Sequence, residues 1–81
     1  TVSGNDLWIV DNGTDRVYKF TNGANVRSGR VAATSSFALN SANTSPMDLV
    51  TDGTRIWVLN DTVGNDRVFR YSTTGTLQGN W

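Results

Sequence analysis

Two segments of this chain repeat each other closely, and this repetition restricts the possible folds more than any other feature of the sequence. Residues 7–20 read LWIVDNGTDRVYKF, and residues 56–71 read IWVLNDTVGNDRVFRY. The copies lie about 50 residues apart, and the turn in the second copy is two residues longer. Gly4 and Gly53 occupy the same place upstream of each copy. The chain is therefore expected to build two units of one architecture.

Each copy has the pattern of two neighbouring strands. Residues 7–10 and 56–59 are apolar at consecutive positions, which is typical of a strand that is buried on both faces. A turn rich in Gly, Asn and Asp follows, and residues 16–20 and 67–71 then alternate between two sides. Both copies are therefore predicted to form hairpins.

The residues between the hairpins predict two further strands. Residues 30–39 (RVAATSSFAL) contain several β-forming residues and indicate a third strand, and residues 40–46 read as a turn-rich crossover. Residues 47–51 indicate a short strand, and Asp52 and Gly53 form a tight turn after it. Every acidic residue is Asp, and Thr, Asn, Ser and Gly dominate the polar positions. An all-β chain with four strands per unit follows, because these residues favour strands and turns over helices.

Four antiparallel strands per repeat, with a period in the forties, predict the blades of a β-propeller. Radial stacking covers both faces of every sheet with a neighbour, which explains strands that are apolar on consecutive positions. Residues 47–50 are then expected innermost, residues 7–11 and 56–60 second, residues 16–20 and 67–71 third, and residues 30–39 outermost. A sandwich or barrel assembled from hairpins is the alternative.

The repeat resembles the NHL-type propeller repeat, in which a proline-led inner strand, an Asp-Gly turn, a buried strand and an Arg-Val-aromatic strand follow one another. The second copy carries this pattern at Pro46, Asp52, Gly53, Ile56, Val58, Asn60, Asn65, Arg67, Val68, Phe69, Gly75 and Leu77. The first copy carries it at Gly4, Leu7, Val10, Asp11, Asp15, Arg16, Val17 and Phe20. Asp48 stands where the family usually has Gly. The resemblance implies a fold and a habit of binding, and it implies no single activity.

The second unit is shorter than the first. If Trp81 holds the place of Phe37, the counterpart of residues 38–49 is missing from it. Residues 1–45 are therefore expected to form a first blade that lacks its inner strand, and residues 46–81 a second blade truncated in its outer strand. Because propellers close with about 4–8 blades, the expected partners are further blades in the same chain or identical chains that form a ring.

Composition excludes several classes of function. The seven basic and seven acidic residues are scattered and form no basic stripe, which argues against nucleic acid as a partner. No apolar run approaches the roughly 20 residues of a membrane span. The chain has no His, Cys or Glu, which removes the Ser-His-Asp triad, the Cys-His pair and most zinc or iron ligand sets. We therefore expect a non-catalytic scaffold or binding module without a cofactor. The alternative is a blade pair of a propeller lyase or hydrolase whose catalytic residues lie elsewhere.

The two hairpin turns hold oxygen atoms that a calcium ion could bind, at Asp11, Asn12, Asp15, Asn60, Asp61 and Asp66. Neither turn has the ligand order of an EF-hand. Hairpin turns use the same residue types for positive φ and for hydrogen bonds to the backbone. The turn role is therefore the preferred interpretation, and calcium binding is the alternative.

The remaining candidate residues are expected to be structural, together with Pro46 and Gly53. Arg16 and Arg67 each follow an Asp and are predicted to contact an Asp of a neighbouring strand, and a clamp for an anionic ligand is the alternative. Trp8 and Trp57 lie inside apolar runs and are predicted to pack between blades, and stacking on sugar rings, as in a lectin, is the alternative. A protein or glycan ligand would bind the face loops. The cysteine-free, Thr- and Asn-rich chain suits an exported bacterial protein, either extracellular or at the cell surface, and the absence of cysteine is equally compatible with the cytoplasm.

Overall fold

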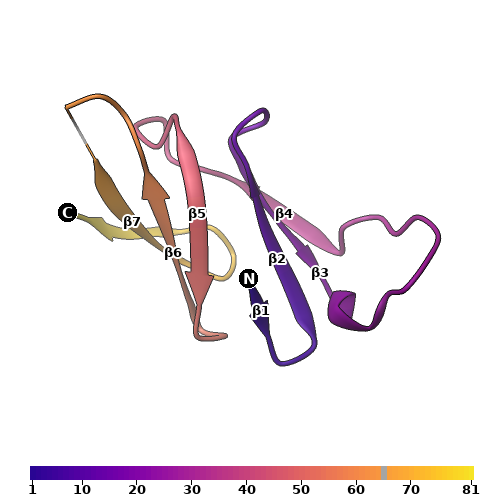
Figure 1. The fold of residues 1–81 in the computed structure, drawn as a ribbon. Helices are drawn as coiled ribbons and strands as arrows, with labels where there is room; N and C mark the ends of the chain where they lie inside the picture. The colour runs from indigo at the N-terminus through magenta and orange to yellow at the C-terminus, as the bar shows by residue number, and fades with distance from the viewer. Residues whose placement is uncertain (65) are drawn as a thin grey trace.

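The chain folds into two four-stranded antiparallel sheets, as the all-β prediction requires. The computed structural model describes residues 1–64 and 66–81. The first sheet has the order β1 (Val2–Ser3), β2 (Asp6–Asp11), β3 (Arg16–Phe20) and β4 (Ser35–Ala38). The second has the order β5 (Pro46–Thr51), β6 (Arg55–Asn60), β7 (Arg67–Ser72) and β8 (Leu77–Asn80). Figure 1 shows the sheets as two neighbouring layers, with β5 next to β2.

The two sheets repeat each other in register, and both predicted hairpins are confirmed. Ile9 pairs with Tyr18 in the first sheet, as Val58 pairs with Phe69 in the second. The outermost positions match as well, because Val17 pairs with Phe37 and Val68 exchanges two backbone hydrogen bonds with Trp81. The structure thus confirms that Trp81 holds the place of Phe37.

The inner and outer strands differ from their predicted extents. The first sheet was expected to lack an inner strand, but β1 occupies that position with two residues, where β5 has six. Thr1 extends this strand, since its amino group donates to the Trp8 carbonyl at 2.7 Å and its carbonyl accepts from the Trp8 amide at 2.8 Å. The outer strand β8 has four residues, as many as β4. Both sheets are therefore complete in strand number.

The strand predicted over residues 30–39 is shorter than expected and covers only β4. Its pairing with β3 starts at Lys19 and Ser35, next to a bond from the Thr34 amide to the Lys19 carbonyl. Because β3 ends at Phe20, residues 30–33 have no partner strand in the first sheet. The chain instead forms a 3-10 helix, η1 (Gly23–Asn25), and an irregular segment that turns at Gly29, where φ is +83°. Tertiary pairing, and not β-propensity, decides the length of this strand.

The core lies between the two sheets. The first sheet contributes Trp8 and Val17, and Val10 and Phe37 pack at its margin. The second sheet contributes the buried side chains of Leu49, Ile56, Val58, Phe69 and Tyr71. Leu39 joins them from the crossover between the sheets. Removing these apolar side chains from water is the main force that holds one sheet against the other.

Buried polar groups fix the crossover onto the second sheet. The Tyr71 hydroxyl accepts hydrogen bonds from the Asn40 amide at 3.0 Å and from Nδ2 of Asn43 at 3.1 Å. Oδ1 of Asn60 accepts from the Ser45 amide at 2.8 Å. Asn43 and Asn60 are each only 1% exposed, so water cannot replace these bonds easily.

Replacing Tyr71 by Phe should reveal the contribution of this network. The change leaves the buried Nδ2 of Asn43 and the part-buried amide of Asn40 without this acceptor, and we expect the free energy of unfolding to fall by about 1–3 kcal/mol. Tyr18→Phe is the matched control, since its hydroxyl lies 3.1 Å from Oγ1 of Thr14 in an exposed pair. Urea unfolding followed by circular dichroism measures both variants. Equal losses in the two would contradict a special role for the buried hydroxyl.

A close approach between the sheets depends on Gly75, which lies in the turn between β7 and β8. Its φ is +97°, and a Cβ atom there would lie 2.5 Å from Cγ of Phe37. The Phe37 ring in turn packs on Tyr71, with the ring centroids 5.6 Å apart. A side chain at position 75 would therefore push the edges of the two sheets apart.

The substitution Gly75→Ala should destabilise the fold by at least about 2 kcal/mol, because backbone strain and overpacking both act at this position. Gly29→Ala is the control, since φ is +83° there and nothing lies within 4 Å of its Cβ position. We expect the control to lose only about 1 kcal/mol, from the backbone term alone. Thermal and urea unfolding compare the two variants, and similar losses would mean that the contact with Phe37 has little effect.

Candidate functional site

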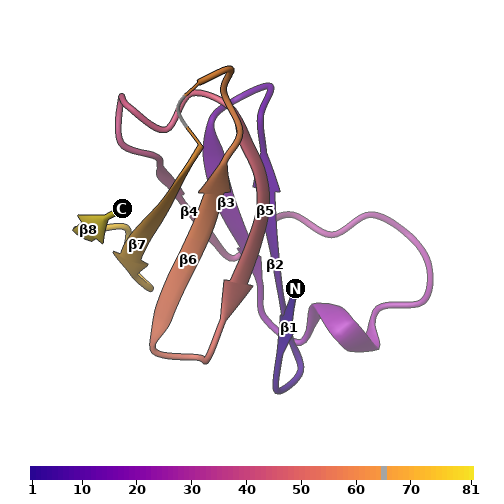
Figure 2. The same cartoon turned by 60° about the vertical axis from the view of Figure 1, so that its left-hand side comes forward.

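The outer faces of the two sheets carry exposed apolar side chains, and they are the candidate site of this molecule. We call one the Trp57 face, formed by Val50, Trp57, Leu59 and Val68 on the second sheet. We call the other the Ile9 face, formed by Leu7, Ile9, Phe20, Val26 and Val31 on the first sheet and its following segment. Figure 2 shows the two sheets from a second direction, with β6 and β7 on one side and β2 on the other.

The Trp57 face follows from the alternation of β6. Because successive side chains of a strand point to opposite sides, Ile56 and Val58 enter the core while Trp57 and Leu59 face outward. Leu59 is 42% exposed, and Val50 of the adjacent strand is 56% exposed. A cavity of about 220 Å³ opens here, lined by Asp48, Leu49, Val50, Trp57, Leu59 and Val68. This face is therefore hollowed and apolar.

The Ile9 face combines β2 and β3 with the segment after them. A second cavity of about 210 Å³ is lined by Leu7, Ile9, Phe20, Gly23, Val26 and Val31. The helix η1 reaches this position through a bond from the Ala24 amide to the Asn5 carbonyl at 3.0 Å. A Cβ atom on Gly23 would lie 2.8 Å from the Cβ atoms of Leu7 and Phe20, so only glycine fits there. Val26 and Val31 could not be assigned to this face from the sequence, because no periodic pattern places them on a sheet face.

The two open faces are repeat counterparts of the two buried ones. In the aligned repeats, Trp57, Leu59 and Val68 correspond to Trp8, Val10 and Val17, which form the inner side of the first sheet. Likewise, Leu7, Ile9 and Phe20 correspond to Ile56, Val58 and Tyr71, which form the inner side of the second sheet. The outer surfaces thus repeat the pattern of the interface inside the molecule.

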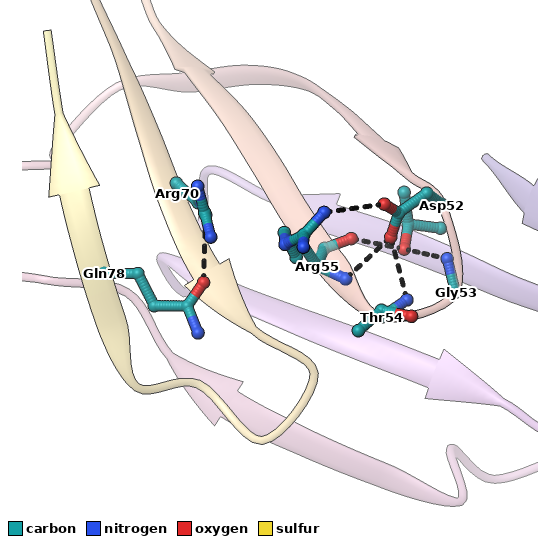
Figure 3. Close-up of polar contacts among 7 residues, drawn as sticks. Asp52, Gly53, Thr54, Arg55, Arg70 and Gln78 are labelled. Carbon is teal, nitrogen blue, oxygen red and sulfur yellow. Dashed lines mark hydrogen bonds and ion pairs between the residues drawn. The ribbon is translucent and has the colours of Figure 1, made fainter.

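The two tryptophans show the difference between a covered and an open face. Trp8 is 4% exposed and lies between the sheets, with Nζ of Lys19 at 5.3 Å from the centre of its ring. Trp57 is half-buried on the open side. Arg70 pairs with Trp57 as Lys19 pairs with Trp8, but its Nε donates to Oε1 of Gln78 at 3.0 Å (Figure 3).

The candidate calcium residues take part in the local structure of the turns. Oδ1 of Asp11 accepts from the Gly13 amide at 2.7 Å, and Oδ1 of Asn60 accepts from Ser45. Asp15 adopts a positive φ of 51°, and its Oδ1 atom is buried without a hydrogen-bond partner in the described structure. The side chains of Asn12, Asp61 and Asp66 are exposed. Within residues 1–64 and 66–81, no three His, Cys, Asp or Glu side chains come together as a metal site.

The two candidate arginines bridge from the third strand of each sheet to its outer strand. Nη2 of Arg16 donates to Oγ of Ser36 at 2.9 Å, and Nη1 of Arg67 donates to Oδ1 of Asn80 at 2.9 Å. Ser36 and Asn80 are themselves repeat counterparts, because they pair with Tyr18 and Phe69. A hydroxyl and an amide oxygen of the outer strands thus accept these two bonds, and the contact of each arginine with an Asp of a neighbouring strand stays a prediction.

Pro46 and Gly53 lie at the two ends of β5. Pro46 is buried at its start, where the register shifts before Asp48, and Gly53 follows its end with φ of +92°. In the β5–β6 turn, Oδ1 of Asp52 accepts from the amides of Arg55 and Thr54 at 2.8 Å each (Figure 3). These two bonds hold the pKa of the Asp52 carboxyl below its usual value.

Asp6 plays a similar part at the start of β2, on the side of that strand that carries Trp8. Its carboxyl accepts from the Asn22 amide at 3.0 Å, which lowers its pKa, and Nζ of Lys19 lies 3.5 Å away. Both carboxylates are exposed enough for solvent to screen them, so they order turns and form no reactive centre.

The geometry of the two faces is the main guide to function for this chain. Comparisons with family models, curated proteins and solved structures find no match. Among the residues that the structure describes, no helix has the length and hydropathy needed to span a membrane. Asn65, which contributes to the NHL resemblance, lies outside the described residues.

A pair of matched substitutions tests the difference between the faces. We expect Trp8→Ala to lower the free energy of unfolding by about 3–5 kcal/mol, or to prevent folding, because it opens a cavity in the core. In dilute solution, Trp57→Ala should cost less than about 2 kcal/mol, since Trp57 is only half-buried and no second sheet covers it. Chemical unfolding followed by circular dichroism decides between them. Equal costs would mean that the two tryptophans are equally buried in the free chain.

Proposed function

We propose that this chain is a pair of β-propeller blades that acts as a non-catalytic scaffold or binding module, and that further blades or identical chains cover its open faces. The observation that carries this proposal is the correspondence between the Trp57 and Ile9 faces and the interface inside the molecule. A blade needs a neighbour on each side, and each sheet here has one neighbour and one open apolar face.

The same observation favours a propeller over a sandwich. In a two-sheet sandwich, each strand alternates between an apolar inner side and a polar outer side. In β2, however, Leu7 and Ile9 point outward while Trp8 and Val10 point inward. A sandwich has no use for apolar residues on both sides of its strands, whereas stacked blades require them.

Ligands of such a module would bind at the loops, because the strands are occupied by packing between sheets. Figure 1 shows that the turn after β2, the crossover after β4 and residues 61–64 after β6 lie at one end of the molecule. Exposed polar residues populate this end, among them Asn12, Thr14, Ser41 and Asp61. A protein or glycan ligand suits this surface. The repeat pattern and the composition favour an exported, NHL-like module.

Tandem copies of the chain test the proposal. Trp81 holds the place of Phe37, and Thr1 pairs with Trp8 as Val50 pairs with Trp57. A copy of residues 38–49 between successive chains would therefore supply the intervening crossover and lengthen the inner strand β1 toward the six residues of β5. Each added copy buries one Trp57 face and one Ile9 face, so we expect the free energy of unfolding to rise by at least about 3 kcal/mol per copy.

Tandem proteins of one to four copies can be compared by urea unfolding. The control carries Leu59→Asp in every copy, which puts a charge on the Trp57 face and should abolish the gain. Stability that does not increase with copy number would rule out the propeller proposal.

A further inference from the structure

We propose that a second copy of this chain covers the open faces, in a head-to-tail arrangement in which the Trp57 face of one copy packs on the Ile9 face of the next. This inference rests on the proposed function, because it names the partner that the open faces take. Successive junctions of this kind would close the copies into a ring.

The template for this junction is the interface inside the molecule. There, the inner side of the first sheet, with Trp8 and Val17, packs on the inner side of the second, with Ile56 and Val58. β2 and β5 meet along this contact. A new copy placed beside the second sheet by the same rotation would set its Ile9 face on the Trp57 face.

The side chains at the new junction match those of the template in kind. On one side, Trp57 replaces Trp8, Leu59 replaces Val10, and Val68 replaces Val17. On the other side, residues of the first sheet replace residues of the second, and each replacement keeps an aliphatic or an aromatic side chain. The aliphatic replacements are Leu7 for Ile56 and Ile9 for Val58, and the aromatic ones are Tyr18 for Phe69 and Phe20 for Tyr71. The pattern that packs well inside the chain is therefore available between chains.

The glycine at each edge supports the same conclusion. Gly75, beside β7, admits the Phe37 ring of the neighbouring sheet inside the molecule. Its place in the first repeat lies between β3 and β4, where Gly23 packs on Leu7 and Phe20 and leaves the middle of β2 open. Ile9, at the centre of that strand, is still 42% exposed. The segment after β3 thus contributes Val26 and Val31 to one side of the Ile9 face and leaves Ile9 itself exposed.

Head-to-tail pairing uses two different surfaces, which distinguishes it from symmetric pairing of like faces. Symmetric contact would put Trp57 against Trp57. Inside the molecule, by contrast, the side of the first sheet that carries Trp8 packs on the side of the second that carries Ile56. The junction is instead heterologous, and a repeated heterologous contact closes into a ring when its rotation allows. With two sheets per chain, the about 4–8 blades of known propellers correspond to about two to four copies.

Two exposed positions allow the junction to be broken from either side. Ile9→Asp places a charge on the Ile9 face, and Leu59→Asp places one on the Trp57 face. Each residue is 42% exposed in the single chain, so the fold should tolerate both changes. Val63→Asp is the control, because Val63 is fully exposed after β6 and lines neither hollow. Circular dichroism and thermal unfolding establish that each variant is folded.

Native mass spectrometry and sedimentation equilibrium then measure the assemblies. The unmodified chain and Val63→Asp should give one discrete mass, a multiple of 8.8 kDa, that dissociates on dilution. Ile9→Asp and Leu59→Asp should each be monomeric when alone. Mixed in equal amounts, they retain one intact Trp57 face and one intact Ile9 face between them, and they should form a one-to-one dimer and nothing larger.

Three outcomes would overturn the inference: a monomer at every concentration, an open-ended series of masses, or self-association of a variant that keeps only one face. The tandem proteins described above separate this failure from that of the proposed function. Tandem stabilisation with a monomeric single chain would reject the second copy as the partner and retain the blade scaffold. A monomer without tandem stabilisation would reject both.

Discussion

The structure depends on one constraint, which is that a small sheet with apolar residues on both faces must be covered on both sides. One junction inside the chain meets this need for half of the surface, where Trp8 and Val17 pack against Ile56 and Val58. Most other features serve that junction. The crossover brings Leu39 into the core, and Gly75 makes room for Phe37. The hydrophobic effect thus determines both what is buried and what remains to be covered.

Polar groups set the geometry of the junction more than its strength. The Tyr71 hydroxyl and the amide of Asn60 hold the crossover at fixed points on the second sheet. Such buried bonds stabilise a fold modestly but strongly disfavour arrangements that would break them. The second sheet is therefore held in one orientation, and a repeated orientation is what an assembly of identical blades requires.

Much of the fold could be predicted from local pattern. The two hairpins, the turn at Gly53 and the match of Trp81 with Phe37 follow from repeated residues whose periodicity is read directly. The helix η1 and the late start of β4 at Ser35 could not be predicted, because they depend on where β3 ends and not on the propensity of residues 21–34. Only the strand residues of the Ile9 face could be predicted from the sequence. Val26 and Val31 join this face because the irregular segment after β3 brings them to it.

The sequence by itself determined that Trp8 and Trp57 would sit in equivalent strands, each with apolar neighbours on both sides. Only the tertiary structure decided that Trp8 is enclosed while Trp57 faces a shallow hollow. The physical reason is that burial is not a property of a residue or of its strand. It depends on whether another sheet covers that face, and within one chain of two sheets a single pair of faces can be covered.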